Sequence, residues 1–241
     1  RLYSLLTAPT EGFAVDYVGT LNYPGAVAEG WADGDHEGHG GFKIADIRTR
    51  IPVWLKQVPD PDVILLKIGT NDFWSGENLA VTQDRLRGLI TDISALRPHA
   101  RIIVANLIPR YDSIDAIQAQ FSASLPALVA TQAALGRKVT FVDMRASFGS
   151  NPADIGADGV HPTASGHDKI ADGWLPAIKN VITPLGTNEP PVIISASARA
   201  DLQHVTVTFS KPINDADGAN PANFSLSGGV AVSQAVLSSS K

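Results

Sequence analysis

Apolar positions in the first 183 residues form short, nearly continuous runs that alternate with longer segments of helical period. The runs at 62–68, 101–107 and 138–144 hold too few polar residues to face water on either side, which is typical of buried parallel strands. Residues 13–18 combine alternation with β-branched side chains and predict a further strand. Strands separated by helices indicate an α/β protein, a three-layer α/β/α fold with a mainly parallel sheet.

The segments between these runs carry apolar residues three or four positions apart, which is the spacing of one helix face. The helices predicted in this way are 42–57, 78–96, 114–135 and a last one that follows Thr163. Thr163 is suited to cap that last helix at its N-terminus. Residues 1–8 read as the end of a further helix, with Leu2, Leu5 and Leu6 on one face.

The pattern changes after residue 183. Residues 184–191 are rich in Pro, Gly and Asn and predict a linker. Beyond it, strands are expected at 192–196, 204–209, 223–226 and 230–236. We therefore divide the chain into an α/β domain at 1–183, the linker, and a partial β-sandwich module at 192–241, which is short for a complete sandwich of about 100 residues.

Composition narrows the classes of function. The 241 residues carry a net charge of −5, and the 19 basic residues are scattered, which argues against a nucleic-acid partner. Because the chain contains no cysteine, disulfides, thiolate metal sites and a cysteine nucleophile are excluded. No run approaches the roughly 18 apolar residues of a membrane-spanning helix, so no membrane span is expected.

Two polar motifs follow predicted strands and suggest catalysis. In Asp158-Gly159-Val160-His161-Pro162, a carboxylate three residues before a histidine suits an Asp that orients a general base. In Gly69-Thr70-Asn71-Asp72, the Asn amide lies at the carboxyl edge of the sheet, where it can donate to a developing oxyanion. Each motif alone is weak, since the Asp–His spacing is common and Asn often only forms turns. Together they favour an acyl-transfer site.

A third stretch, 36–42, reads His-Glu-Gly-His-Gly-Gly-Phe. Gly41 precedes a predicted helix, so its backbone N–H is a candidate second oxyanion donor, although a plain helix-start glycine is the alternative. His36 and His39, together with nearby carboxylates, could also be read as a metal cluster. Their spacing suits no common metal site, so we expect no metal there and assign both histidines to the substrate-binding rim. Trp74 is a further rim candidate, a stacking platform for sugar or simply a packed aromatic.

These motifs resemble the blocks of the SGNH (GDSL-type) hydrolase family. The stretch containing Asn71 looks like the third block, the stretch with Asp158 and His161 looks like the fifth, and 36–42 looks like the second block of carbohydrate esterases that deacetylate xylan. The resemblance covers roughly residues 1–183. It implies a flavodoxin-like α/β/α fold and serine esterase activity without a cofactor.

The first block of that family, Gly-Asp-Ser at the end of the first strand, does not occur in the sequence. By the resemblance, the strand that carries it would lie centrally, between 13–18 and 62–68. A missing central strand would leave two rows of backbone groups unpaired. We therefore expect that a segment outside these residues supplies both the strand and the serine, with Ser75 as a reserve nucleophile.

The sequence thus predicts an esterase that removes acetyl or short acyl groups from a carbohydrate such as xylan. His161 is the predicted base, Asp158 its orienter, and Asn71 and Gly41 the oxyanion donors. The C-terminal stretches 207–213 and 223–228 resemble bacterial Ig-like modules that follow secreted enzymes, so a secreted or cell-surface bacterial protein is expected. A non-catalytic carbohydrate-binding or surface-display module is the alternative function.

Overall fold

A computed structural model of the chain provides the architecture. It describes residues 1–8, 11, 13–25, 33–182, 192–198, 203–209, 218–226 and 231–236. The predicted linker at 184–191 lies outside the described residues. None of the helices within these ranges is long and apolar enough to cross a lipid bilayer.

The central sheet contains three parallel strands, β3 (Val63–Leu66), β4 (Arg101–Ala105) and β5 (Val139–Val142), in the order β3-β4-β5. All three fall inside runs that the apolar pattern assigned to buried parallel strands. The middle strand is the most deeply buried, since no residue from Ile102 to Ala105 exceeds 2% exposure. The predicted parallel α/β fold is therefore confirmed.

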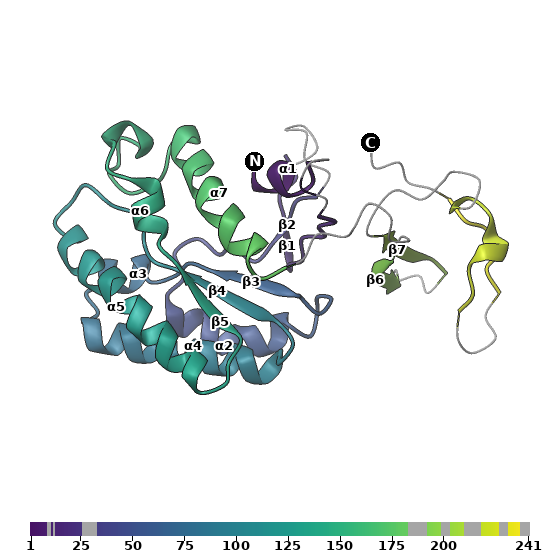
Figure 1. The fold of residues 1–241 in the computed structure, drawn as a ribbon, viewed down its shortest axis with the longest axis horizontal. Helices are drawn as coiled ribbons and strands as arrows, with labels where there is room; N and C mark the ends of the chain where they lie inside the picture. Colours follow the sequence, from purple (N-terminus) through teal and green to yellow (C-terminus); the bar gives the residue numbers. More distant parts are fainter. Residues whose placement is uncertain are drawn as a thin grey trace.

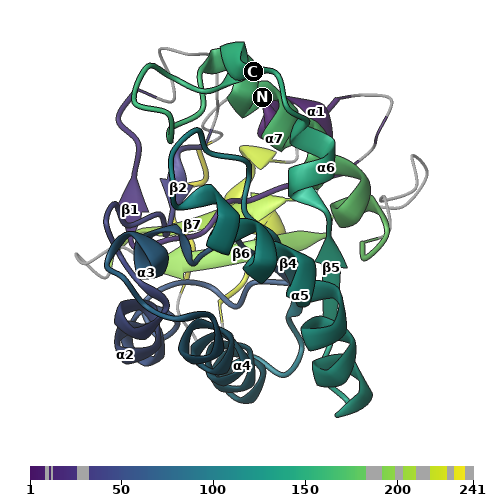
Figure 2. The ribbon, with the colours of Figure 1, turned by 90° about the vertical axis from the view of Figure 1, so that its left-hand side faces the viewer.

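Helices cover both faces of this sheet (Figures 1 and 2). One layer consists of α2 (Ile44–Trp54), α4 (Leu79–Leu96) and α5 (Asp115–Ala134). The other contains α1 (Leu2–Leu6), α6 (Met144–Phe148) and α7 (Ala164–Lys179). Alternate residues of β4 point into the two layers, Ile102 and Val104 toward the first and Ile103 toward the second, as the two-residue period of a strand requires.

The prediction of a strand at 13–18 is wrong. The structure places no strand there, although Phe13 is buried and Val15 packs against the core cluster on the α7 side. A strand requires a neighbour that exchanges backbone hydrogen bonds with it, and none of the described segments lies in that position. The Tyr17 N–H donates instead to the carboxylate of Asp33, a side chain from a neighbouring loop.

The β3 edge that does not face β4 has no strand partner among the described residues. Its apolar side chains are consequently less buried than those of β4: Val63, Ile64 and Leu65 are each only partly covered. An apolar strand with one open edge is an acceptor for further strand pairing. The short pair β1 (Leu21–Asn22) and β2 (Asp35–His36) forms a separate antiparallel ladder.

The C-terminal region contains β6 (Ile193–Ala198) and β7 (Val205–Phe209), which pair in antiparallel fashion near the predicted positions. The strands expected at 223–226 and 230–236 are not formed in their described parts. Pro221–Asn223 is a 3-10 turn, because Asn220 caps it and proline opens it, and neither 224–226 nor 231–236 joins a ladder. Alternating apolar residues at 223–226 and 231–236 therefore did not suffice to predict strands, because a strand also needs a neighbouring strand to pair with.

Candidate active site

The DGVHP loop brings a histidine and a carboxylate into direct contact. His161 Nδ1 lies 2.6 Å from Asp158 Oδ2. The backbone N–H groups of His161 and Val160 donate to Asp158 Oδ1 at 3.0 and 2.9 Å. These two backbone bonds, and then the bond to the imidazole, lower the pKa of Asp158 to about 2. The carboxylate of Asp158 is therefore ionised at neutral pH.

The second nitrogen of His161 is open to a reactant. The side chain of His161 is 82% exposed and that of Asp158 is 53% exposed. With Nδ1 held by Asp158, the tautomer that keeps the proton on Nδ1 leaves Nε2 as the acceptor. This arrangement can take a proton from a hydroxyl nucleophile and return it to a leaving group.

Local geometry explains how the loop holds its shape. Gly159 has φ 72°, a left-handed conformation that favours glycine. The Gly156 N–H donates to His161 O at 2.7 Å, and the Thr163 N–H donates to Asp154 O at 2.9 Å. Helix α7 begins directly after the loop, with Thr163 as its N-cap, as predicted. The Asp158–His161 pair therefore lies directly before the N-terminus of α7, which fixes its position.

The buried carboxylate of Asp154 connects this loop to helix α7. Asp154 belongs to the 3-10 turn η1 (Pro152–Asp154), is 3% exposed, and pairs with Lys169 of α7. It also accepts a hydrogen bond from Ser165 Oγ at 2.7 Å. The hydrogen bonds from Lys169 and Ser165 lower the pKa of Asp154, so this carboxylate remains charged.

The GTND stretch forms the short helix α3 (Thr70–Trp74) at the carboxyl end of β3. Asn71 Nδ2 donates to the carbonyl of Phe42 at 3.0 Å, which places the amide beside the Gly41–Phe42 turn. Gly41 has φ 79°, and its N–H has no hydrogen-bond partner among the described residues. The Asn71 amide keeps one N–H that is not used by Phe42, and it lies beside the unpaired N–H of Gly41. Two hydrogen-bond donors of this kind can bind an oxyanion.

Asp72 provides a second hydrogen bond between the GTND stretch and the start of α2. Its side chain is fully buried, and its Oδ2 accepts the N–H of Ile44, the first residue of α2, at 3.1 Å. Arg85 lies 3.5 Å from the other oxygen. Desolvation raises the pKa of Asp72, which the bonds from Ile44 and Arg85 partly oppose. Sequence reasoning gave Asp72 no role, yet it fixes the start of α2, and with it Gly41, relative to Asn71.

His39 and His36 differ in their surroundings. The His39 ring contacts the rings of both Phe42 and Trp54, with centroid separations of 4.8 and 4.2 Å. Its Nε2 lies 2.6 Å from Glu37 Oε1. Glu37 in turn accepts hydrogen bonds from the backbone and hydroxyl of Thr20, both at 2.8 Å. His36 is exposed, and its Nδ1 accepts the Gly38 N–H. No group of three or more possible metal ligands occurs in the described part of the chain.

Two residues at the site were missed by sequence reasoning. Arg110 and Tyr111 follow β4, and the Tyr111 N–H donates to Gly159 O of the catalytic loop at 2.8 Å. The guanidinium of Arg110 lies 5.4 Å from the ring centroid of Trp74. The available signal was their position: like GTND, the stretch Pro109-Arg110-Tyr111-Asp112 comes directly after a buried strand, at the same edge of the sheet.

The reserve nucleophile Ser75 is the C-cap of α3, where its hydroxyl donates to Asp72 O at 2.9 Å. Within the described ranges, no serine hydroxyl forms a hydrogen bond with His161. In the described part of the chain, the His161–Asp158 pair and the Asn71–Gly41 region are therefore present without a serine hydroxyl in contact with the imidazole.

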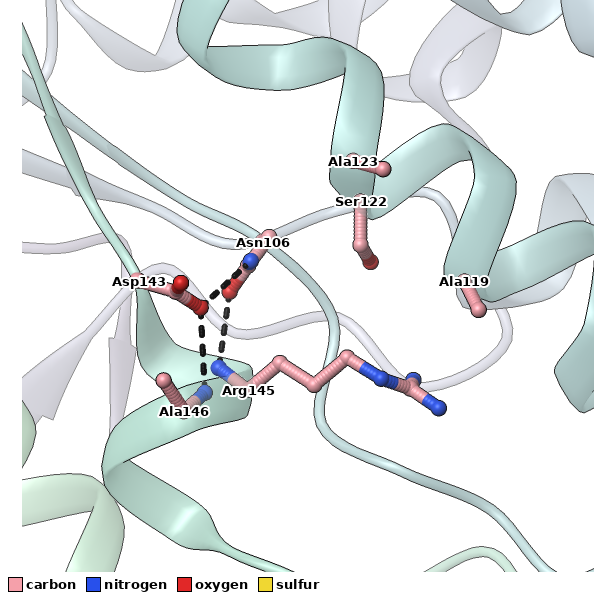
Figure 3. Close-up of a pocket in the computed structure, with 7 residues that line it drawn as sticks. All are labelled: Asn106, Ala119, Ser122, Ala123, Asp143, Arg145 and Ala146. Carbon is pink, nitrogen blue, oxygen red and sulfur yellow. Dashed lines mark hydrogen bonds between the residues drawn. The ribbon is translucent and has the colours of Figure 1, made fainter.

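A shallow hollow between α5 and α6 lies at the carboxyl ends of β4 and β5 (Figure 3). Its polar groups bind one another: Asn106 Nδ2 donates to Asp143 at 2.8 Å, and the Arg145 N–H donates to Asn106 Oδ1 at 2.8 Å. The Ala146 N–H donates to the same Asp143 oxygen. None of the predicted site residues lines the hollow, and its bonded groups join β4 to β5 and α6.

Comparison with known proteins agrees with this geometry. Residues 10–169 match the model of the GDSL-like Lipase/Acylhydrolase family. The chain therefore belongs to this family, a class of carboxylic ester hydrolases.

The chain is similar to three solved structures of carbohydrate and acetyl esterases. A Clostridium thermocellum family 3 carbohydrate esterase is 35% identical, with a TM-score of 0.65 over 75% of this chain and 84% of that one. A family 3 carbohydrate esterase from Talaromyces cellulolyticus is 25% identical, with a TM-score of 0.66 over 77% and 90%. An acetyl esterase with a bound acetate ion is 25% identical, with a TM-score of 0.65 over 75% and 88%.

A curated relative from Acetivibrio thermocellus, provisionally named endoglucanase X, is 30% identical over 148 residues. The match spans 61% of this chain and 63% of that protein, so the chain covers less than two thirds of this relative's length.

Proposed function

We propose that this chain is the base-bearing part of a serine esterase that removes acetyl or other short acyl groups from a carbohydrate such as xylan. The observation that carries the proposal is the 2.6 Å contact between His161 and Asp158. It is supported by the hydrogen bond from Asn71 to Phe42, which brings the Asn71 amide beside Gly41. The similarity to family 3 carbohydrate esterases supports a glycan ester as substrate.

In the proposed reaction, a serine hydroxyl attacks the ester carbonyl while His161 Nε2 takes the hydroxyl proton. Asp158 stabilises the imidazolium that forms and holds its orientation. The negative charge that develops on the carbonyl oxygen is stabilised by the Gly41 N–H and the Asn71 amide. His161 then protonates the departing sugar oxygen, which leaves as a hydroxyl and leaves the acyl group on the serine. Water, deprotonated by His161, attacks this acyl-serine, and the acid is released. No step calls for a cofactor.

We place the nucleophilic serine outside these 241 residues. The apolar edge of β3, which has no strand partner within the described ranges, supports this placement, since an added parallel strand there would end beside Asn71. The chain alone is then inactive. His36, exposed on β2, and Trp74, exposed on α3, are proposed to contact the substrate, whereas the stacked His39 is proposed to support the Gly41 turn.

The test is hydrolysis of p-nitrophenyl acetate and of acetylated xylan by the chain preceded by a strand that ends in Gly-Asp-Ser. We expect turnover that falls on the order of 10³-fold or more in His161→Ala, with the fold intact by circular dichroism. Turnover that survives this substitution would show that His161 is not the base.

A non-catalytic carbohydrate-binding module is the second candidate, favoured by the lack of a serine in contact with His161 among the described residues. It predicts glycan binding by the lengthened chain without turnover. Measurable ester hydrolysis excludes it.

A further inference from the structure

Two exposed aromatic side chains lie in the stretches that follow β3 and β4. Trp74, the last residue of α3, is 66% exposed, and Tyr111, in the loop after β4, is 45% exposed. Trp and Tyr are enriched at binding surfaces, where an exposed ring face can pack on a ligand.

Arg110 fixes one face of the Trp74 ring. The guanidinium is 5.4 Å from the indole centroid, within the range of a cation–π contact. Arg110 itself is 4% exposed, pairs with Asp112, and lies 3.5 Å from Gln118 Oε1. Trp74 remains 66% exposed although Arg110 contacts its ring. A ring held in this way loses little conformational freedom when a ligand packs on it.

The charge of Arg110 is paired close to its contact with Trp74. Asp112 neutralises the guanidinium, so the rim around Trp74 offers an uncharged surface in place of an anion site.

Tyr111 is tied to the catalytic loop. Its N–H donates to Gly159 O at 2.8 Å, and its hydroxyl donates to Ser150 O at 3.0 Å. Gly159 packs so closely on this backbone that a Cβ there would lie 3.4 Å from Tyr111 O. Tyr111 is therefore anchored to the loop that carries His161, and Arg110, its neighbour in sequence, connects it to Trp74.

We propose that Trp74 and Tyr111 are two stacking platforms for the sugar rings of one neutral oligosaccharide, and that Arg110 is the positioning residue that holds Trp74. This inference rests on the proposed glycan esterase function and narrows its substrate. The axial C–H faces of pyranose rings pack on aromatic rings while their hydroxyls remain hydrated. Two platforms on one rim select a chain of several sugars over a small free ester.

The test measures binding without turnover, using the 241-residue chain and deacetylated xylohexaose in isothermal titration calorimetry. Trp74→Ala and Tyr111→Ala are each expected to weaken binding by about 10-fold. Leu135→Ala is the matched control, because Leu135 is 65% exposed at the C-terminal end of α5, and it should leave the affinity unchanged.

A double-mutant cycle tests the role of Arg110. Arg110→Gln should weaken xylohexaose binding in the parent chain but add nothing to Trp74→Ala, since Arg110 acts through that ring. Additive losses would assign Arg110 a purely structural role and overturn that part of the proposal. Melting temperatures verify that each variant is folded.

Equal xylohexaose affinity in the parent and both aromatic variants, or no affinity in the parent, overturns the platform proposal. Neither result bears on ester hydrolysis by the lengthened chain, which tests the proposed function separately. Conversely, a lengthened chain that binds xylohexaose through Trp74 and Tyr111 but hydrolyses no ester supports the platforms and contradicts the esterase.

Discussion

Single residues at this site owe their properties to short-range hydrogen bonds. One oxygen of Asp158 accepts two backbone N–H groups and the other contacts the imidazole of His161, all within a four-residue loop. Because all these partners lie within three residues, the sequence alone predicted the pair. The roles of Arg110 and Asp72 depend on residues of other elements, so sequence spacing could not reveal them.

Asp158 is expected to titrate near pH 2. Its pKa in the folded state lies below the ordinary value of 3.8, so the ionised Asp158 stabilises the folded chain. This stabilisation is fully present above pH 3.8 and is lost as the pH falls through about 2. Carbon-13 NMR of the carboxyl group measures this midpoint. His161→Ala should move it part of the way back, because the backbone donors remain. A midpoint near 3.8 in the parent chain would contradict the observed bonds.

Gly41→Ala tests the strain at the oxyanion turn. Nothing lies within 4 Å of a Cβ at Gly41 or at Gly40, but only Gly41 has a left-handed φ, at 79°. We expect Gly41→Ala to lower the free energy of unfolding by about 1 kcal/mol, and Gly40→Ala to have a smaller effect. Urea denaturation of both variants measures the two free energies of unfolding. Equal decreases in the two variants would show that the left-handed conformation of Gly41 is not the cause.

At the scale of elements, the site is assembled where helices begin and parallel strands end. Asp72 of α3 accepts the first N–H of α2, and Thr163 caps α7 directly after the catalytic loop. Most of these elements were predictable, because apolar periodicity within one segment specifies a helix or a buried strand. The strand expected at 13–18 failed because pairing requires a neighbour, which a local pattern does not supply.

Asp72 should control stability with a distinctive pH dependence. Its pKa is raised in the folded state, so the folded chain binds more protons than the unfolded chain above pH 3.8, and stability falls as the pH rises through the folded pKa. Asp72→Asn keeps an acceptor for Ile44 and should abolish this fall. Asp72→Leu removes the acceptor and should cost about 1–3 kcal/mol. Urea denaturation between pH 4 and 8 measures both effects. If Asp72→Asn showed the same dependence of stability on pH as the parent chain, Asp72 would not be the group responsible.

For the whole molecule, the three-layer architecture brings the stretches after β3 and β4, with Asn71 and Arg110, to the carboxyl edge of one parallel sheet, and the bond from Tyr111 to Gly159 ties the His161 loop to them. The order of strands and helices along the chain was sufficient to predict this edge for Asn71, because parallel strands bring their carboxyl ends to the same side, but the part played by Arg110 was not predicted. The order was not sufficient to predict which side chains meet across that edge, as Trp74 and Arg110 do. The second edge of β3 remains unpaired among the described strands, and the proposed nucleophile belongs there.

The most direct measurement is reaction with a serine-directed fluorophosphonate, followed by mass spectrometry of the labelled peptide. The account predicts no adduct on the 241-residue chain. A chain preceded by a strand ending in Gly-Asp-Ser should be labelled on that added serine, and His161→Ala should suppress the labelling. An adduct on Ser75 or any other serine of the 241 residues, or labelling that is indifferent to His161, would contradict it.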